Sequence, residues 1–308
     1  MNREIIVICG PTAVGKTKYA IETALNFNGE VVSCDSMQLY KYMNIGSAKP
    51  TPEEQIMVKH HLVDQIDPSG FFTVAKYQKL AKEAIDQIFS TGKTPVIAGG
   101  TGLYLNALLY DMDFSAPPRN DTFRETLYAE AEEFGPDYIY QKLAALDAHA
   151  AMRIHPNNIK KVVRAIEAAV EGEKVKDFAT DLMSTKDYGA KMVCLTRDRE
   201  ELYARINQRV DILIETGLVE EVRGLLNMGL GQEDISMKGI GYKEIIGYCN
   251  GEYSLDDAVD LVKKNTRHYA KRQLTWFKRY EKMKWFNISD YDNDESCLKE
   301  IFQWLQNK

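Results

Sequence analysis

The sequence lacks any uninterrupted apolar stretch that approaches the roughly 18 residues of a membrane span. An apolar run that begins within the first few residues leaves no room for a signal peptide, so we expect a cytoplasmic protein with no membrane partner. Internal repeats are also missing, and nothing in the sequence requires more than one copy, so we expect a monomer. No C-x-x-C pair occurs, which argues against a zinc site or a disulfide framework among the five cysteines: Cys9, Cys34, Cys194, Cys249 and Cys297.

What is present indicates one large α/β core with a smaller lobe. The chain has 308 residues, of which 44% are hydrophobic and 27% charged, as is usual for a soluble globular protein. Apolar runs predict strands at 5–9, 30–34, 95–98 and 191–195. Periodic segments and capping residues predict helices at 16–26, 74–89, 101–109 and 200–216, and a long helix after Ser254. This alternation predicts a parallel sheet flanked by helices, of the P-loop NTPase type, with an inserted α-helical lobe.

The motif GPTAVGKT directly follows the first predicted strand and opens the first predicted helix. A strand that turns through two glycines into a helix directs several backbone N–H groups and the positive end of the helix dipole at one point. Lys16 can reach the same point, and the Thr17 hydroxyl is placed to contact a Mg²⁺ ion that bridges bound phosphates. We therefore predict a phosphate site formed by Gly10, Pro11, Thr12, Ala13, Val14, Gly15, Lys16 and Thr17.

The third predicted strand argues against an ordinary nucleotide hydrolase. Such enzymes carry Asp or Glu at the end of a later strand to hold the magnesium shell. Here the strand at 95–98 ends in Gly99-Gly100-Thr101-Gly102, with no carboxylate. The Asn-Lys-x-Asp tetrad of a GTP switch protein is missing as well. The alternative is that the loop binds a diphosphate that leaves as a group during the reaction, rather than a phosphate that is hydrolysed.

The second predicted strand ends in Asp35-Ser36-Met37-Gln38. The carboxyl ends of parallel strands meet at one edge of a sheet, so we expect Asp35 to face the same crevice as the phosphate loop. Position alone leaves three roles open for this carboxylate: a ligand of the magnesium shell, a general base, or a cap on the next helix.

Eight motifs in register over some nine-tenths of the chain resemble the family of bacterial tRNA dimethylallyltransferases. These motifs are GPTAVGKT at 10–17, DSMQ at 35–38, GSAKP at 46–50, HHLVD at 60–64, GGTGLY at 99–104, RIHPN at 153–157, GIGYKE at 239–244 and TRHYAKRQLTWF at 266–277. The chain departs from the family pattern at His268, where Gln is usual, and at Asn158, where Asp is usual. Neither position belongs to the phosphate loop or to the Asp35 motif.

The resemblance implies transfer of a dimethylallyl group from dimethylallyl diphosphate to the exocyclic N6 amine of the adenosine on the 3′ side of the tRNA anticodon. It implies Mg²⁺ as cofactor, Asp35 as the base, and Thr12 and Arg209 beside the diphosphate. Arg205 and Arg209 lie one turn apart on the 200–216 helix. From the residues alone, this pair is either a diphosphate clamp or a surface feature. The tRNA-binding residues expected in the core are Asp35, Ser36, Met37, Gln38, Thr101, Lys271, Arg272 and Gln273.

The charge distribution supports an RNA partner although the chain carries a formal net charge of −6. Between Lys263 and Lys284, nine Lys or Arg residues stand against the single Glu281, so this segment carries +8 and the remainder −14. One basic face on an acidic protein is the pattern expected where a polyanion binds. A solvated helix face with aromatic residues packed into the core remains the other interpretation of this segment.

The composition changes between about 114 and 190, where Ala, Glu, Asp and Tyr predominate. We predict a helical insertion at 114–190 and a phosphate-binding core formed by 1–113 and 191–308. The small core of the helical insertion is predicted to include Leu143, Leu146, Ile154, Val162, Val163 and Ile166. The resemblance implies that the insertion contacts the anticodon stem-loop, and its basic candidates are Arg124, Lys160, Lys161 and Arg164.

Three other functions compete with this hypothesis. A prenyltransferase that acts on free adenine nucleotides would share the phosphate loop but would not need the insertion or the basic helix. A P-loop small-molecule kinase would consume ATP. A non-catalytic RNA-binding module would leave the phosphate loop without a purpose.

Overall fold

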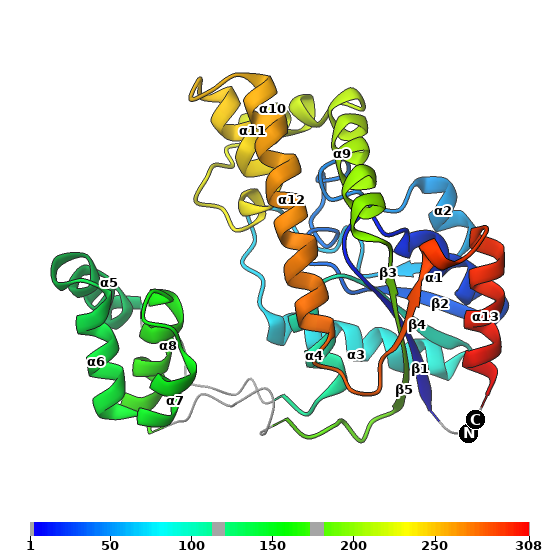
Figure 1. Ribbon diagram of the computed structural model, residues 1–308, viewed down its shortest axis with the longest axis horizontal. Coiled ribbons are helices and arrows are strands. Elements are labelled where there is room, and N and C mark those ends of the chain that lie inside the picture. The colour runs from blue at the N-terminus through cyan, green and yellow to red at the C-terminus, as the bar shows by residue number, and fades with distance from the viewer. Residues whose placement is uncertain (1–2, 113–120, 173–181, 308) are drawn as a thin grey trace. The chain divides into compact units, whose positions relative to one another are not determined.

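The computed structural model describes residues 3–112, 121–172 and 182–307 (Figure 1). The chain forms two compact units, which are considered separately. The core unit consists of Met1–Asp111 and Ser184–Lys308, and the helical unit is Met112–Met183. Within the described part of the chain, no helix combines the length and the apolar character needed to cross a membrane.

The described part of the core unit contains a six-stranded sheet in the order β3-β2-β4-β1-β5-β6, and every strand pair is parallel. Cys9 lies opposite Gly99 and Ser33 opposite Ala98, so β1, β2 and β4 end at the same edge. This confirms the predicted fold class and four predicted strands, whereas the two short outer strands, β3 and β6, were missed. The strands are β1 (Glu4–Cys9), β2 (Gly29–Ser33), β3 (His60–His61), β4 (Thr94–Gly99), β5 (Gly189–Thr196) and β6 (Lys284–Asn287).

Helices connect the strands and cover both faces of the sheet. Those that the sequence predicted begin and end within two residues of the predicted positions: α1 (Lys16–Asn26), α3 (Val74–Ser90), α4 (Gly102–Leu109) and α9 (Arg199–Glu215). The long helix α12 (Leu255–Phe277) begins at Ser254 with the expected capping box. The remaining helices of the core are α2 (Pro52–Met57), α10 (Leu218–Asn227), α11 (Tyr242–Cys249) and α13 (Asp294–Gln306), with two short 3₁₀ turns, Ser236–Lys238 and Ile288–Asp290.

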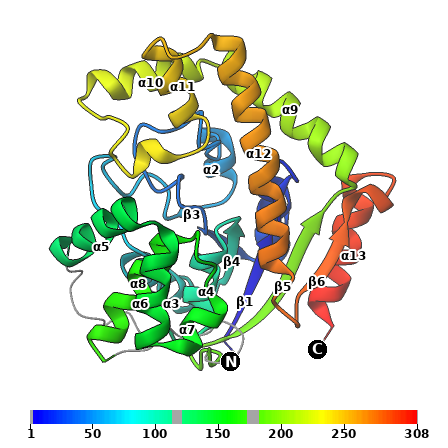
Figure 2. The same cartoon turned by 60° about the vertical axis from the view of Figure 1, so that its left-hand side comes forward.

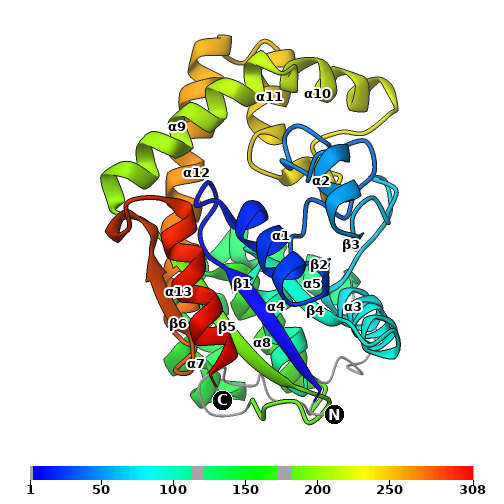
Figure 3. The ribbon, with the colours of Figure 1, turned by 90° about the vertical axis from the view of Figure 1, so that its right-hand side faces the viewer.

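The alternation of side chains along the strands divides the core into two apolar layers. Ile6 and Ile8 of β1 pack with α1 and α13, which lie side by side on one face of the sheet (Figure 3). Ile5 and Val7 point the other way and pack in the layer that contains α3 and α4. Both faces of the sheet are therefore buried, and the loops at the carboxyl edge are left to form a site.

Two long helices lie next to these loops. Figure 2 shows α9 and α12 side by side, and α12 also contacts α4 and α11. Gln273 of α12 hydrogen-bonds to the loops after β1 and β4, which places this helix over the carboxyl edge.

The helical unit contains α5 (Asp121–Phe134), α6 (Pro136–Leu146), α7 (Ala148–Arg153) and α8 (Ile159–Val170). Leu143, Val162, Val163 and Ile166 are buried in its core, as predicted, and Ile154 is half-buried. Leu146 was assigned wrongly, because it ends α6 and is 51% exposed.

The predicted end of the insertion at residue 190 needs correction. Residues 184–190 belong to the core unit. They bond to the C-terminal end of α4 and lead into β5. The Thr185 amide donates to the Leu109 carbonyl, the Tyr188 hydroxyl to the Leu108 carbonyl, and Gly189 pairs with Glu4 of β1. The predicted first boundary, at residues 113 and 114, lies outside the described residues.

Candidate active site

A cavity of about 450 Å³ lies among the loops at the carboxyl edge and the facing sides of α9 and α12. A volume of this order is typical of small-molecule sites. The cavity brings together residues that are far apart in the sequence. Those predicted as site residues that line it are Thr12, Asp35, Ser36, Met37, Arg209 and Arg272.

The phosphate loop has the backbone of an anion site. Gly10 and Gly15 have φ values of 149° and 112°, and Ala13 also lies in the left-handed region at 65°. A Cβ atom on Gly10 would come within 2.5 Å of the Leu195 carbonyl oxygen, so this position requires glycine. The loop leads directly into α1, whose N-terminus attracts an anion.

Cationic side chains hold three carbonyl groups of this loop. The Lys16 ammonium donates to the Pro11 carbonyl at 2.8 Å. The Arg205 guanidinium donates to the Ala13 carbonyl at 3.1 Å, and that of Arg197 to the Val14 carbonyl at 3.2 Å. Sequence reasoning considered Arg205 as a clamp for the ligand or as a surface feature, and it missed Arg197. Both residues support the loop that would bind the ligand.

Lys16, Arg209 and Asp35 form the electrostatic centre of the site. Burial lowers the pKa of Lys16 to about 8; the Asp35 carboxylate opposes this shift and the Arg209 guanidinium adds to it. Burial also lowers the pKa of Arg209, again against the effect of Asp35. Two half-buried cations thus share one carboxylate. A bound polyanion would supply the missing negative charge.

The Asp35 carboxylate is fixed by its own turn. Its Oδ1 accepts a hydrogen bond from the Met37 amide at 2.9 Å, and the next residues form turns rather than a helix. The proposed role as a helix cap is therefore wrong. The Thr101 hydroxyl accepts from the Ser36 amide at 3.1 Å, and Tyr269 lines the same cavity as Asp35. Burial and the neighbouring Asp35 carboxylate raise the pKa of Tyr269, so this phenol stays protonated beside the carboxylate.

Gln273 has a different position from the one expected. We predicted contact with tRNA, but its side chain is 5% exposed and both ends of its amide are used within the core. Its Oε1 accepts from the Thr12 amide at 2.8 Å, and its Nε2 donates to the Gly100 carbonyl at 2.9 Å. Gln273 therefore ties the phosphate loop to the loop after β4.

The glycines that replace a carboxylate at the end of β4 are explained by these close approaches. A Cβ atom on Gly99 would overlap the Cys34 carbonyl group, and one on Gly100 would overlap the Gln273 amide. A Cβ atom on Gly102 would likewise overlap the Trp276 ring. The β2 loop and α12 thus pack directly on this segment.

The other predicted tRNA contacts occupy varied positions. Lys271 and Arg272 are exposed on α12, and Arg272 stacks 5.6 Å from the Tyr269 ring centre beside the cavity. The Gln38 amide is used internally, because it accepts from the Ser33 hydroxyl at 2.9 Å and donates to the Ala48 carbonyl at 3.3 Å.

In the helical unit, three of the four predicted cations are available on the surface. The side chains of Lys160, Lys161 and Arg164 are exposed on α8. Arg124 is largely covered and forms an ion pair with the buried Glu167, in which its Nε donates at 2.9 Å. Arg124 therefore holds α5 to α8 within this unit.

Sequence reasoning missed most of the apolar wall of the cavity. Ile206, Val210 and Leu213 recur at helical spacing on the same side of α9 as Arg209, and this periodicity is the signal that could have found them. The motifs GSAKP and GIGYKE also contribute residues 46–48 and 239–241, although no role was predicted for them. The other apolar and aromatic lining residues are Met37, Tyr40, Phe72, Tyr104, Ile235, Val262 and Tyr269.

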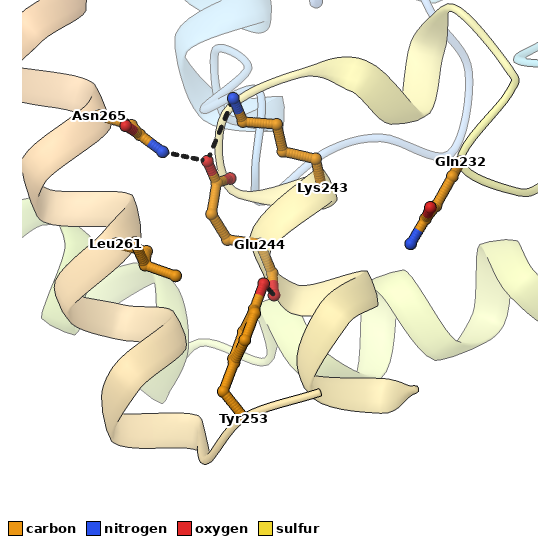
Figure 4. A pocket seen from close by; sticks show the side chains of 6 residues that line it. All are labelled: Gln232, Lys243, Glu244, Tyr253, Leu261 and Asn265. Atoms are coloured by element: carbon orange, nitrogen blue, oxygen red, sulfur yellow. Dashed lines mark hydrogen bonds and ion pairs between the residues drawn. The ribbon is translucent and has the colours of Figure 1, made fainter. Parts of the chain in front are cut away.

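A second, more open cavity of about 370 Å³ lies between α11 and α12 (Figure 4). Glu244 is buried in its wall; its carboxylate accepts from the Gly241 amide at 2.8 Å and from the Asn265 side chain at 2.7 Å, while Lys243 lies 3.5 Å away. The Tyr253 hydroxyl donates to the Glu244 carbonyl. These contacts fix the start of α11 against α12.

Among the described residues, no group of three or more His, Cys, Asp or Glu side chains is placed to hold a metal ion. Thr17 lies in the first turn of α1, where its hydroxyl fits the oxygen preference of Mg²⁺. An ion there would take its other ligands from phosphate oxygens and water, which is the usual binding mode of Mg²⁺ with phosphate compounds.

Comparison with known proteins agrees with this geometry. The family model described as IPP transferase matches residues 38–280. The chain belongs to this family. It is 54% identical to the tRNA dimethylallyltransferase of Alkaliphilus oremlandii over 98% of this chain and 97% of that protein. It is 48% identical to the enzyme of the same name from Clostridioides difficile, with the same two shares covered.

Solved structures give the same result. The tRNA isopentenylpyrophosphate transferase of Bacillus halodurans is 40% identical, with a TM-score of 0.74, and the match covers 99% of this chain and 96% of that one. A eukaryotic dimethylallyltransferase acting on tRNA is 26% identical, with a TM-score of 0.83, over 100% of this chain and 80% of the other.

The lowered pKa of Lys16 makes anion binding pH-dependent. Its pKa of about 8 means that the ammonium loses its proton as the pH rises through that value, so the affinity for an alkyl diphosphate should fall, by up to about tenfold per pH unit. Calorimetric titration between pH 7 and 9.5 measures this. In the control Lys16→Arg the guanidinium stays charged, and affinity should change little over this range. An equal fall in that variant would assign the pH dependence to another group.

Proposed function

We propose that this protein transfers a dimethylallyl group from dimethylallyl diphosphate to the exocyclic N6 amine of the adenosine on the 3′ side of the tRNA anticodon, with release of diphosphate. One observation supports it most directly: a single cavity is lined by Thr12 of the phosphate loop, by Arg209 and by Asp35. The names of the relatives, which are 45–54% identical, agree with this activity.

The phosphate loop and Arg209 would hold the leaving group. The diphosphate gains negative charge as the allylic C1–O bond breaks, and the loop amides, Lys16 and Arg209 would stabilise that charge. Because these cations are half-buried, water would screen their interaction with the leaving oxygens less than at an exposed site. Mg²⁺ bound to the diphosphate and to the Thr17 hydroxyl would add positive charge to the same oxygens.

Asp35 would accept the proton from the amine. The lone pair of the adenine N6 is delocalised into the ring, which makes the amine a poor nucleophile, so removal of its proton as the new C–N bond forms assists the reaction. The N6 atom bonds to C1, the C1–O bond breaks, and the proton passes to the carboxylate. The hydrogen bond from Met37 to Oδ1 orients Asp35 for this step.

The adenosine must leave the stack of its loop to reach Asp35, at a cost of a few kcal/mol. We propose that backbone contacts from the exposed cations of α12 and α8 offset this cost: Lys271 and Arg272 on the core, and Lys160, Lys161 and Arg164 on the helical unit.

The function is tested by incubating the protein with radiolabelled dimethylallyl diphosphate, Mg²⁺ and unmodified bulk tRNA, followed by nucleoside analysis. We expect label on N6-dimethylallyladenosine from tRNA and none on AMP that is added as a competitor. Label on AMP alone would favour a prenyltransferase of free nucleotides, and ATP consumption without prenyl transfer would favour a kinase.

Replacement Asp35→Asn tests the role of the base. The amide oxygen can still accept from the Met37 amide, but the group can no longer take a proton, so kcat should fall by roughly 10² to 10⁴ while tRNA affinity changes little. Steady-state kinetics and filter binding measure the two quantities. Asp67→Asn is the control and should retain normal turnover. Asp67 is exposed in a turn, where its carboxylate accepts from the Ser69 amide. Normal turnover in Asp35→Asn would remove Asp35 from the chemistry.

Replacement Lys271→Ala tests the RNA-binding face of α12. Loss of one phosphate contact should weaken tRNA binding and reduce the slope of log K against log salt concentration by about 1. Binding titrations at several salt concentrations measure the slope. Lys299→Ala on α13, at an equally exposed position, should leave it unchanged. The same slope in wild type and Lys271→Ala would mean that this side chain is simply solvated.

A further inference from the structure

Glu221 of α10 receives an unusual number of hydrogen bonds from one short loop. Its Oε2 accepts from the backbone amides of Asn44 and Ile45 at 2.7 and 2.8 Å, and its Oε1 accepts from the Gly46 amide at 3.1 Å. Oε1 also accepts from the Tyr242 hydroxyl at 2.8 Å. Four donors from two separate segments therefore converge on one half-buried carboxylate.

The loop that Glu221 holds is a wall of the cavity. Gly46, Ser47 and Ala48 line the same space as Asp35 and Arg209. The Ala48 carbonyl accepts from the Gln38 side chain at 3.3 Å, which links this wall to the segment that begins with Asp35. A shift of the loop would therefore move the side of the cavity that carries the base.

Tyr242 joins a second wall to the first. It is fully buried at the start of α11 and directly follows Gly239, Ile240 and Gly241, which line the cavity. Its ring packs on Gly46 so closely that a Cβ atom there would lie 2.6 Å from the ring. Burial and the neighbouring carboxylate raise the pKa of Tyr242, so its hydroxyl remains a donor to Glu221.

Only an ionised carboxylate satisfies all four donors. Each of its oxygens accepts two hydrogen bonds, and charge-assisted bonds of this kind are stronger than neutral ones. A glutamine of the same size would direct an NH₂ group at donors on one side. The arrangement is thus sensitive to charge and not only to shape.

We propose that Glu221 is a positioning residue that fixes the two cavity walls, 44–48 and 239–242, in the arrangement that admits the nucleobase. It does not touch the substrate. The proposal rests on the proposed function, because it assigns these walls to the acceptor side, next to Asp35 and Gln38. The diphosphate end, formed by the phosphate loop and Arg209, makes no hydrogen bond to Glu221 among the described residues.

The test compares Glu221→Gln with wild type in the labelled transfer assay, with each substrate varied in turn. We expect KM for tRNA to rise by roughly tenfold, because part of a charge-assisted network is lost, and KM for dimethylallyl diphosphate to change less than about twofold. Glu220→Gln, at the preceding and exposed residue of the same helix, is the matched control and should behave as wild type.

Thermal unfolding separates positioning from simple stabilisation. A lower Tm in Glu221→Gln with both KM values unchanged would overturn the proposal, as would an equal rise in both KM values. If Glu221→Gln does not fold, Tyr242→Phe decides the question, since it keeps the ring on Gly46 and removes one donor. This variant should raise KM for tRNA by about threefold, and an unchanged value would overturn the proposal. Wild type that fails to label tRNA would instead refute the proposed function itself.

Discussion

Two half-buried cations that share one carboxylate are the main constraint on this site. Burial lowers the pKa of both Lys16 and Arg209, while Asp35 supports their charged forms. Charge that is partly removed from water is unfavourable unless an opposite charge compensates it, so this site favours a polyanion over water. The same requirement explains the surroundings of the phosphate loop. Its carbonyl groups would repel an anion if they faced the cavity, and three of them are engaged by Lys16, Arg197 and Arg205.

Helix α12 resolves the apparent conflict between an acidic protein and a polyanionic substrate. Val262, Thr266 and Tyr269 line the cavity, and Gln273, one turn further, bonds to the phosphate loop. The opposite positions are exposed at the same helical spacing: Lys264, His268, Lys271, Thr275 and Lys278. One helix therefore serves the site with one side and presents positive charge to solvent with the other. The aromatic residues Phe277 and Tyr280 are buried, so in their case the interpretation as core packing is the correct one.

Local signals explain why much of this architecture could be predicted from the sequence. A phosphate loop is one continuous segment between a strand and a helix, and Asp35 follows the next strand directly, so the rule for parallel sheets placed both at one edge. Contacts between distant segments had no such signal. Gln273 reaches Thr12 across 261 residues, and Glu221 reaches the Asn44 loop across 177. The Arg124 side chain looked like a surface cation because its partner, Glu167, lies 43 residues later on another helix.

The residues at the end of β4 distinguish this site from that of a nucleotide hydrolase. Where such enzymes carry an acid, this chain has Gly99 and Gly100, and the space beside them is filled by the Cys34 backbone and the Gln273 amide. Among the described residues that line the cavity, Asp35 is the single acid. One of its oxygens accepts from the Met37 amide, so a proton released in the cavity meets one oriented carboxylate. The proposed transfer needs one acceptor for the proton of the amine, and Asp35 is the lining group placed to be that acceptor.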